Sequence, residues 1–222
     1  MKLLSTTMAI GTGLALLLTG CSEEDTTTPE SSETEASTKE VKLYFAPEVS
    51  GESVNCSSTF HVGSGDANAS LKDFRMFISE VALLKEDGTR VNITLDQNDW
   101  QYENIALLDF EDNSAGCAES GNTADMHHYL SGKVPEGVYT QVAFTLGVPE
   151  VVNHNKYPDI KVLNHSKMDW GWQNGRKFMK LEVLAKSEGA KAWNFHLGST
   201  DCTADESQAS GIYARGSGSG ES

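Results

Sequence analysis

Apolar side chains recur at every second position along residues 139–146, and this alternation restricts the fold more than any other feature. Val142, Phe144 and Leu146 would share one face of an extended segment, because successive side chains of a β-strand point to opposite faces. Other short apolar or alternating runs lie at residues 41–46, 91–95, 105–110, 178–184 and 192–197. Many short strands with few helical windows predict an all-β fold, a single antiparallel β-sandwich or barrel-like domain with long loops.

Residues 74–84 allow two interpretations. An amphipathic helix would place Phe77 and Val81 on one face. A strand fits the same segment if the alternation contains one irregularity. A turn at residues 86–89 and the strand-like run 91–95 follow directly. The hairpin that these segments would form favours the strand.

Two segments are predicted to be loops. Residues 55–69 are rich in Gly, Asn and Ser, and residues 148–167 show no period and contain two prolines. A loop as long as 148–167 inside a compact domain usually has a function. The runs 178–184 and 192–197 then predict a hairpin. We expect a metal-binding loop at one end of the sheet.

The start of the chain predicts an exported lipoprotein. Met1-Lys2 and a short apolar run at residues 14–18 precede the string Leu-Thr-Gly-Cys, which resembles a lipobox and ends at Cys21. The apolar run is too short to cross a bilayer. We expect residues 1–20 to be removed as a signal peptide and Cys21 to carry the lipid. Ser22 favours transfer to the outer membrane, so a periplasmic domain would be held at the membrane by its lipid anchor alone.

Three further regions follow the signal. Residues 21–40 are Ser, Thr, Glu, Asp and Pro with almost no apolar side chain, which predicts a disordered acidic linker. Residues 41–202 have the length of one ordinary domain, and residues 203–222 form a polar, flexible tail. The chain has 17 Lys and Arg against 32 Asp and Glu, a formal net charge of −15. This charge excludes binding to nucleic acid through its phosphates.

Two tryptophans, Trp170 and Trp172, are the most unusual candidates for a site. Their spacing puts both indoles on one face if the segment is extended. Three histidines, His154, His165 and His196, lie in the flanking segments. One interpretation is a pair of core aromatics beside a glycine-containing turn. The other is a soft-metal site with an aromatic group at its edge.

Apolar and polar residues alternate in the segment around His196. Trp193, Phe195 and Leu197 alternate with Asn194 and His196, so the histidine is predicted on the polar face. There it is either part of a site at the rim of the sheet or a solvent-facing side chain. Trp193 is predicted to pack with the apolar set.

Several separated strings resemble one family. They are DFRMFIS at 73–79, ALLDFED at 106–112, LGVP at 146–149, NH at 153–154, MDWGWQNGRKF at 168–178 and FHLGSTDC at 195–202. In this order they resemble the MbnP family of copper-binding proteins, also called metallo-mystery pair four-Cys proteins. Relatives include copper-repressed surface proteins of methanotrophs. The resemblance covers residues 41–202.

The resemblance implies a copper site and a partner. By the resemblance, two of the copper ligands are His154 and His196. The third is a tryptophan oxidised to kynurenine, either Trp170 or Trp172. An indole N–H is a donor only, whereas the aromatic amine of kynurenine can coordinate Cu(I) or Cu(II). The implied oxidant is a di-haem cytochrome c peroxidase-like protein of the MbnH family. The present chain would then be that partner's substrate and not itself an enzyme.

The chain departs from the family pattern at two positions near the site. Arg176 stands where an aromatic residue is expected, and His165 stands at a position that is usually apolar. His165 is interpreted as a surface residue, with an extra metal ligand as the alternative.

The cysteines are the third departure. An exported domain favours disulfides, but excluding Cys21 leaves Cys56, Cys117 and Cys202, and the family's fourth cysteine is missing. We expect a Cys56–Cys117 disulfide and no partner for Cys202. The alternative is that Cys202 binds copper as a thiolate.

Three other functions are compatible with parts of the sequence. The acidic group Asp109, Glu111 and Asp112 offers oxygen ligands to calcium, although it lacks EF-hand spacing. Aromatic side chains such as Trp170, acting as a stacking platform on a β-sandwich, suit a carbohydrate-binding or adhesion module with no metal. A copper enzyme that turns over a substrate without a haem partner is the last alternative.

Overall fold

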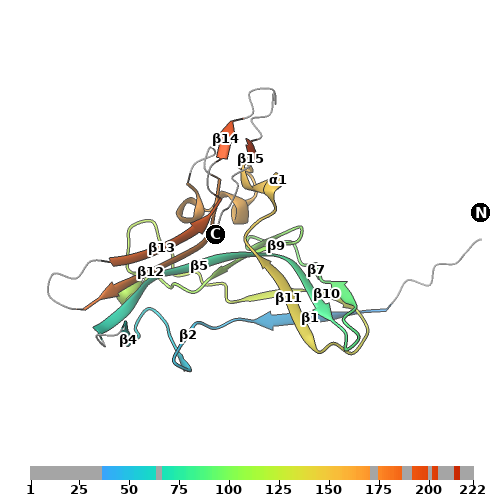
Figure 1. Cartoon of the computed structure of the whole chain (residues 1–222), viewed down its shortest axis with the longest axis horizontal. Helices are drawn as coiled ribbons and strands as arrows, with labels where there is room; N and C mark the ends of the chain where they lie inside the picture. The colour runs from blue at the N-terminus through green and yellow to red at the C-terminus, as the bar shows by residue number, and fades with distance from the viewer. Residues whose placement is uncertain are drawn as a thin grey trace, which may run out of the picture. The chain divides into compact units, whose positions relative to one another are not determined.

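The computed structural model describes residues 37–63, 67–170, 175–186 and 192–199, and the backbone pairing of strands β14 (Cys202–Ala204) and β15 (Tyr213–Arg215) (Figure 1). Every strand pair within these residues is antiparallel. The predicted all-β antiparallel fold is therefore confirmed. No helix in the described part of the chain is long and apolar enough to cross a membrane.

Strand β5 (Ala67–Leu84) is the centre of the larger sheet, which has the order β13-β12-β5-β9-β8. The other members of this path are β12 (Lys177–Ala185), β13 (Ala192–Gly198), β9 (Ile105–Asp109) and β8 (Gln101–Tyr102). Three further strands pair with β5: β4 (Phe60–Val62), β6 (Arg90–Asn92) and β11 (Gln141–Leu146). Residues 178–184 and 192–197 form the expected hairpin.

The strand interpretation of residues 74–84 is confirmed, and so is its irregularity. Glu80 has a φ of 53°, and the pairing of β5 with β11 shifts between Ala143 and Thr145. A residue in the left-handed region inside a strand marks a bulge. The predicted loop at 55–69 is wrong in part, because it contains β4 and the start of β5.

A smaller sheet packs on one face of β5 and β9. It contains β1 (Thr38–Tyr44), β10 (Tyr129–Pro135) and β7 (Thr94–Leu95). Ile78, Leu108 and Leu130 belong to the buried cluster between the two sheets. This arrangement is a sandwich of two antiparallel sheets. Two short hairpins, β2 (Glu48–Val49) with β3 (Glu52–Ser53) and β14 with β15, stand apart from both sheets.

The long segment after β11 covers the opposite face of β5. It contains the short helices α1 (Glu150–Asn153), η2 (Lys161–Asn164) and η3 (Ser166–Met168). Phe77 of β5 packs with Val152, Leu163 and Met168 from this segment, whereas its neighbour Ile78 lies in the core between the sheets. The predicted functional loop is therefore a packed layer, held in place by a second apolar cluster.

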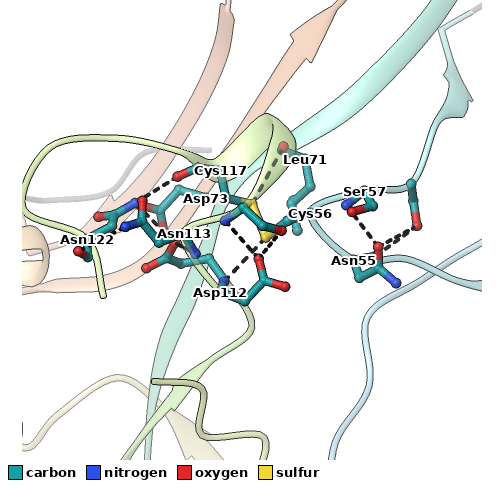
Figure 2. Close-up of a disulfide and its surroundings, with 12 residues drawn as sticks. Asn55, Cys56, Ser57, Leu71, Asp73, Asp112, Asn113, Cys117 and Asn122 are labelled. Atoms are coloured by element: carbon teal, nitrogen blue, oxygen red, sulfur yellow. Dashed lines mark hydrogen bonds between the residues drawn. A yellow bond between two sulfur atoms is a disulfide. The ribbon is translucent and has the colours of Figure 1, made fainter. Parts of the chain in front are cut away.

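A buried disulfide joins Cys56 to Cys117 across 61 residues, which confirms the expected pairing (Figure 2). It ties the segment before β4 to helix η1 (Ala115–Cys117). The backbone N–H of Asp112 lies 3.4 Å from the Cys56 sulfur, and the Cys117 sulfur lies 3.7 Å from the Leu71 carbonyl oxygen. The side chain of Cys202 and the whole of Cys21 lie outside the described residues.

Candidate metal site

Trp170 lies beside the end of the β12–β13 hairpin. Its backbone N–H donates to the Gly175 carbonyl oxygen over 3.0 Å, and the preceding residue, Asp169, forms a β-bridge with Arg176. These contacts place the ring of Trp170 6.4 Å from that of His196, centroid to centroid. Trp172 lies outside the described residues.

Gly198 gives the Trp170 ring its space. A Cβ built at position 198 would overlap ring atoms of Trp170 and lie 3.0 Å from the Arg176 carbonyl oxygen. The ammonium of Lys177 lies 5.7 Å from the centre of the same ring, and it donates to the carbonyl oxygens of Lys167 and Asp169. The indole of Trp170 is therefore held against β13 at Gly198, which follows His196 by two residues.

His196 projects from β13 toward β12, where it meets Glu182. Its Nε2 atom lies 2.8 Å from Glu182 Oε1. Burial alone would raise the pKa of the Glu182 carboxyl, but the hydrogen bonds from Lys72 and His196 and the charge of Lys180 lower it to about 2. The carboxylate is therefore ionised throughout the physiological range.

The apolar residues that alternate with His196 are not buried. Trp193 is 57% exposed and Phe195 39% exposed, and their rings stack with centroids 5.9 Å apart. Trp193, which was predicted to pack, contacts Phe195 but lies largely at the surface. The aromatic face of β13 is thus partly open to solvent.

His154 follows helix α1 and is buried. The Asn153 amide nitrogen lies 3.1 Å from His154 Nε2 and donates to Ser199 Oγ over 3.1 Å. The Asn153 amide oxygen accepts from the backbone N–H of Arg176 over 2.8 Å. Asn153 therefore connects the segment that carries His154 to the end of β13, close to Gly198.

Gly175 makes this approach of Asn153 possible. It has a φ of +72°, and a Cβ there would lie 2.6 Å from the Asn153 amide nitrogen. Glycine satisfies both the left-handed backbone and the close contact. Two glycines thus bring the segments of His154, Trp170 and His196 to one end of the β12–β13 hairpin.

Arg176 fixes the backbone on both sides of His154. Its buried guanidinium donates to the carbonyl oxygens of Val152, Asn153, Asn155 and Leu163 over 2.5 to 3.0 Å. Burial lowers the pKa of Arg176, yet an arginine stays charged in proteins. A cavity of about 320 Å³ opens beside it, lined in part by Asn155, Tyr157 and Asn164.

His165, which the sequence predicted at the surface, is partly buried. Its Nδ1 atom is enclosed and has no hydrogen-bond partner among the described residues. Burial, together with the charges of Arg75, Lys167 and Lys180, lowers its pKa to about 4. The imidazole is therefore neutral near pH 7.

Two of the three acidic residues considered for calcium, Asp109 and Glu111, pair with a buried arginine. Arg75, which is buried, is paired with Asp73, Asp109 and Glu111. Burial raises the pKa of Asp109 to about 6 against the effect of Arg75. Asp112 instead accepts hydrogen bonds from the backbone N–H and hydroxyl of Ser114.

A chain of ion pairs continues from Arg75 to His196. Lys180 lies 2.5 Å from Asp73 Oδ2 and 3.3 Å from Glu182 Oε1. Sequence reasoning missed these residues, although a signal was present. Lys180 and Glu182 stand two apart in an apolar strand, as Asp73 and Arg75 do in the strand beside it.

Comparisons with known proteins show the family of the chain. The family model of MbnP matches residues 38–213. The chain belongs to the MbnP family. It is similar to the solved structure of MbnP from Methylosinus trichosporium, with 32% identity, a TM-score of 0.68, and coverage of 81% of this chain and 68% of that chain. No curated protein matches. The resemblance seen in the sequence is confirmed.

A soft metal bound to this MbnP-family chain would need several ligand atoms close together. Within the described residues, no three His, Cys, Asp or Glu side chains are grouped so as to hold a metal ion. Two imidazoles and an aromatic ring do lie at one end of the hairpin, and imidazole suits copper. The space at Gly198 sets the ring beside His196. The residue types at this end of the hairpin suit copper only if the indole gains an atom with a lone pair.

Proposed function

We propose that this chain binds one copper ion through His154, His196 and a kynurenine made from Trp170. The observation that carries the proposal is the position of the Trp170 ring, 6.4 Å from the His196 ring in the space beside Gly198. Trp172 is the alternative site of modification. Family membership supports both choices equally.

The chemistry explains why the oxidation and the metal belong together. Copper accepts electron pairs from imidazole nitrogens and from an aromatic amine. The indole N–H has no lone pair to offer, so the unmodified site would have two ligands in place of three. Copper affinity should therefore depend on the modification.

We further propose that the oxidation is the work of a separate protein. The sequence contains none of the nucleotide, metalloprotease or hydrolase motifs that would indicate an enzyme, and tryptophan oxidation needs an external oxidant. A di-haem cytochrome c peroxidase-like protein of the MbnH family fits that role. The chain itself would be a copper-holding protein and no enzyme, anchored through Cys21 in the periplasm or at the outer membrane.

The experiment is coexpression with the haem partner, followed by peptide mass spectrometry of residues 162–177 and measurement of copper per chain. We expect the mass of kynurenine on Trp170 and about one copper per chain, with copper lost in His154→Ala and His196→Ala. Trp193→Phe is the matched control, because Trp193 is exposed and contacts Phe195. The proposal is wrong if both Trp170 and Trp172 stay unmodified and copper binding does not exceed that of His154→Ala.

One observation favours a second function. The rings of Trp193 and Phe195 are stacked and exposed, and exposed aromatic rings can stack against sugars. A carbohydrate-binding or adhesion module would bind glycans without metal. It predicts glycan-array binding that survives chelation and disappears in Trp193→Ala, whereas the copper site should be unaffected by that substitution.

A further inference from the structure

We propose that Glu182 is a positioning residue that decides which nitrogen of His196 faces the metal. The carboxylate would hold Nε2 in its protonated form, so that the lone pair of Nδ1 is available to copper. This inference rests on the proposed copper site and assigns to it a residue outside the expected ligand set.

The hydrogen bond between the two side chains fixes the tautomer. Glu182 Oε1 lies 2.8 Å from His196 Nε2. An ionised carboxylate only accepts hydrogen bonds, so the ring nitrogen that faces it carries the hydrogen. In a neutral imidazole the other nitrogen is then the acceptor. Nδ1 is therefore the nitrogen of His196 that can bind a metal.

Glu182 is itself held on both oxygens. Lys72 lies 2.9 Å from Oε2, and Lys180 lies 3.3 Å from Oε1. Lys180 in turn contacts the fully buried Asp73. Glu182 is only 5% exposed, so its carboxylate has little freedom to turn away from His196. The ion pairs thus extend from the centre of the sheet to the ring of the proposed ligand.

Partners of this kind are common around metal-binding histidines. A carboxylate that accepts from the second ring nitrogen orients the ring and raises its basicity, and its loss typically weakens metal binding by roughly 10–100-fold. A merely structural contact between His196 and Glu182 would have no such effect on a metal. Copper affinity therefore distinguishes a positioning role of Glu182 from a merely structural one.

The first measurement uses the metal-free protein. Long-range ¹H–¹⁵N correlation spectra of the uniformly ¹⁵N-labelled chain report which ring nitrogen of each histidine carries hydrogen. We expect His196 to be a single neutral tautomer with hydrogen on Nε2. Glu182→Ala should give a mixture of tautomers, and Glu182→Gln should keep the wild-type form in part, because its amide oxygen still accepts. A wild-type His196 with hydrogen on Nδ1 would overturn the proposal.

The second measurement is copper affinity of the modified protein, by competition with a chelator. We expect Glu182→Ala to bind roughly 10–100-fold more weakly and Glu182→Gln to fall between it and the wild type. Lys161→Met is the control, because it removes an exposed ion pair, with Asp99, that involves neither Glu182 nor His196. It should leave the tautomer unchanged and the affinity within a few-fold.

The outcomes separate this inference from the proposed function. If His196→Ala binds copper as the wild type does, His196 is not a ligand and both proposals fail. If His196→Ala loses copper while Glu182→Ala and Glu182→Gln keep wild-type affinity, the copper site stands and the positioning role fails. The tautomer in the wild-type protein decides the question even if Glu182→Ala does not fold.

Discussion

The ring of Trp170 occupies the space that any side chain larger than hydrogen at position 198 would need. Gly198 ends β13 two residues after His196, so the backbone conformation and the absence of a side chain together set the indole against the hairpin. The distance between a proposed ligand and the ring proposed for oxidation therefore depends on a residue that would coordinate nothing.

Gly198→Ala should push the Trp170 ring away from His196. We expect a loss of about 1–3 kcal/mol in the free energy of unfolding, the usual cost of overpacking, and copper binding weakened by roughly 10-fold. Urea unfolding and chelator competition measure the two effects. In a Trp170→Ala background the stability cost of Gly198→Ala should shrink, since the overlapping ring is gone. An equal cost in both backgrounds would contradict the contact.

The sequence predicted the strands where a clear period was present. The hairpin of β12 and β13 and the strand at 105–110 follow from apolar runs bounded by turns. The start of β5 was missed because residues 67–73 follow a segment rich in Gly, Asn and Ser, whose composition indicates a loop. Tertiary pairing with β4 and β12 overrides that local preference.

The contacts within the candidate site could not be predicted in the same way. The bond from Glu182 to His196 depends on the hairpin register, in which His196 stands opposite Lys180. His165 has polar neighbours and was assigned to the surface, but the packed loop encloses its Nδ1. Trp193 lies on an apolar face of β13 and is nevertheless 57% exposed. Alternation identifies a strand's two faces without saying what covers each.

Arg176 should hold the backbone of the segment that carries His154 in one conformation. Arg176→Lys keeps the charge but cannot reach the four carbonyl oxygens that the guanidinium contacts. We expect a loss of at least about 2 kcal/mol in the free energy of unfolding. Amide hydrogen exchange across residues 152–163, measured by mass spectrometry, should become faster. Amides of β1 and β10 serve as the internal control. Unchanged exchange at 152–163 would show that Arg176 does not hold this segment.

Arg75 should be far more important for stability than an exposed ion pair. Arg75→Met leaves Asp109 and Glu111 buried without their cation and Asp73 with Lys180 alone, which should cost about 3–5 kcal/mol. Lys161→Met removes a pair with Asp99 in which both side chains are mostly exposed, and should cost no more than about 1 kcal/mol. Urea unfolding of the two variants at pH 7 tests the comparison. Equal losses would contradict the buried cluster.

His165 should make stability depend on pH in a defined window. Its pKa is about 4 in the folded chain, lowered chiefly by burial from the ordinary value of 6.5. Between these values the unfolded chain binds the proton and the folded chain does not. The stability contributed by the neutral ring is therefore fully present above pH 6.5 and is lost as the pH falls toward 4.

The size and sign of this effect can be isolated with His165→Gln. One proton corresponds to a slope of at most about 1.4 kcal/mol per pH unit, which the variant should lack. Asp109 acts in the opposite direction, because its pKa is raised to about 6 and acid therefore favours its folded state. Asp109 is present in both proteins, so its effect cancels in the difference. Urea unfolding of both proteins from pH 7 to pH 4 should show a wild-type advantage that declines with acid. A constant difference across this range would mean that His165 is accessible to protons in the folded chain.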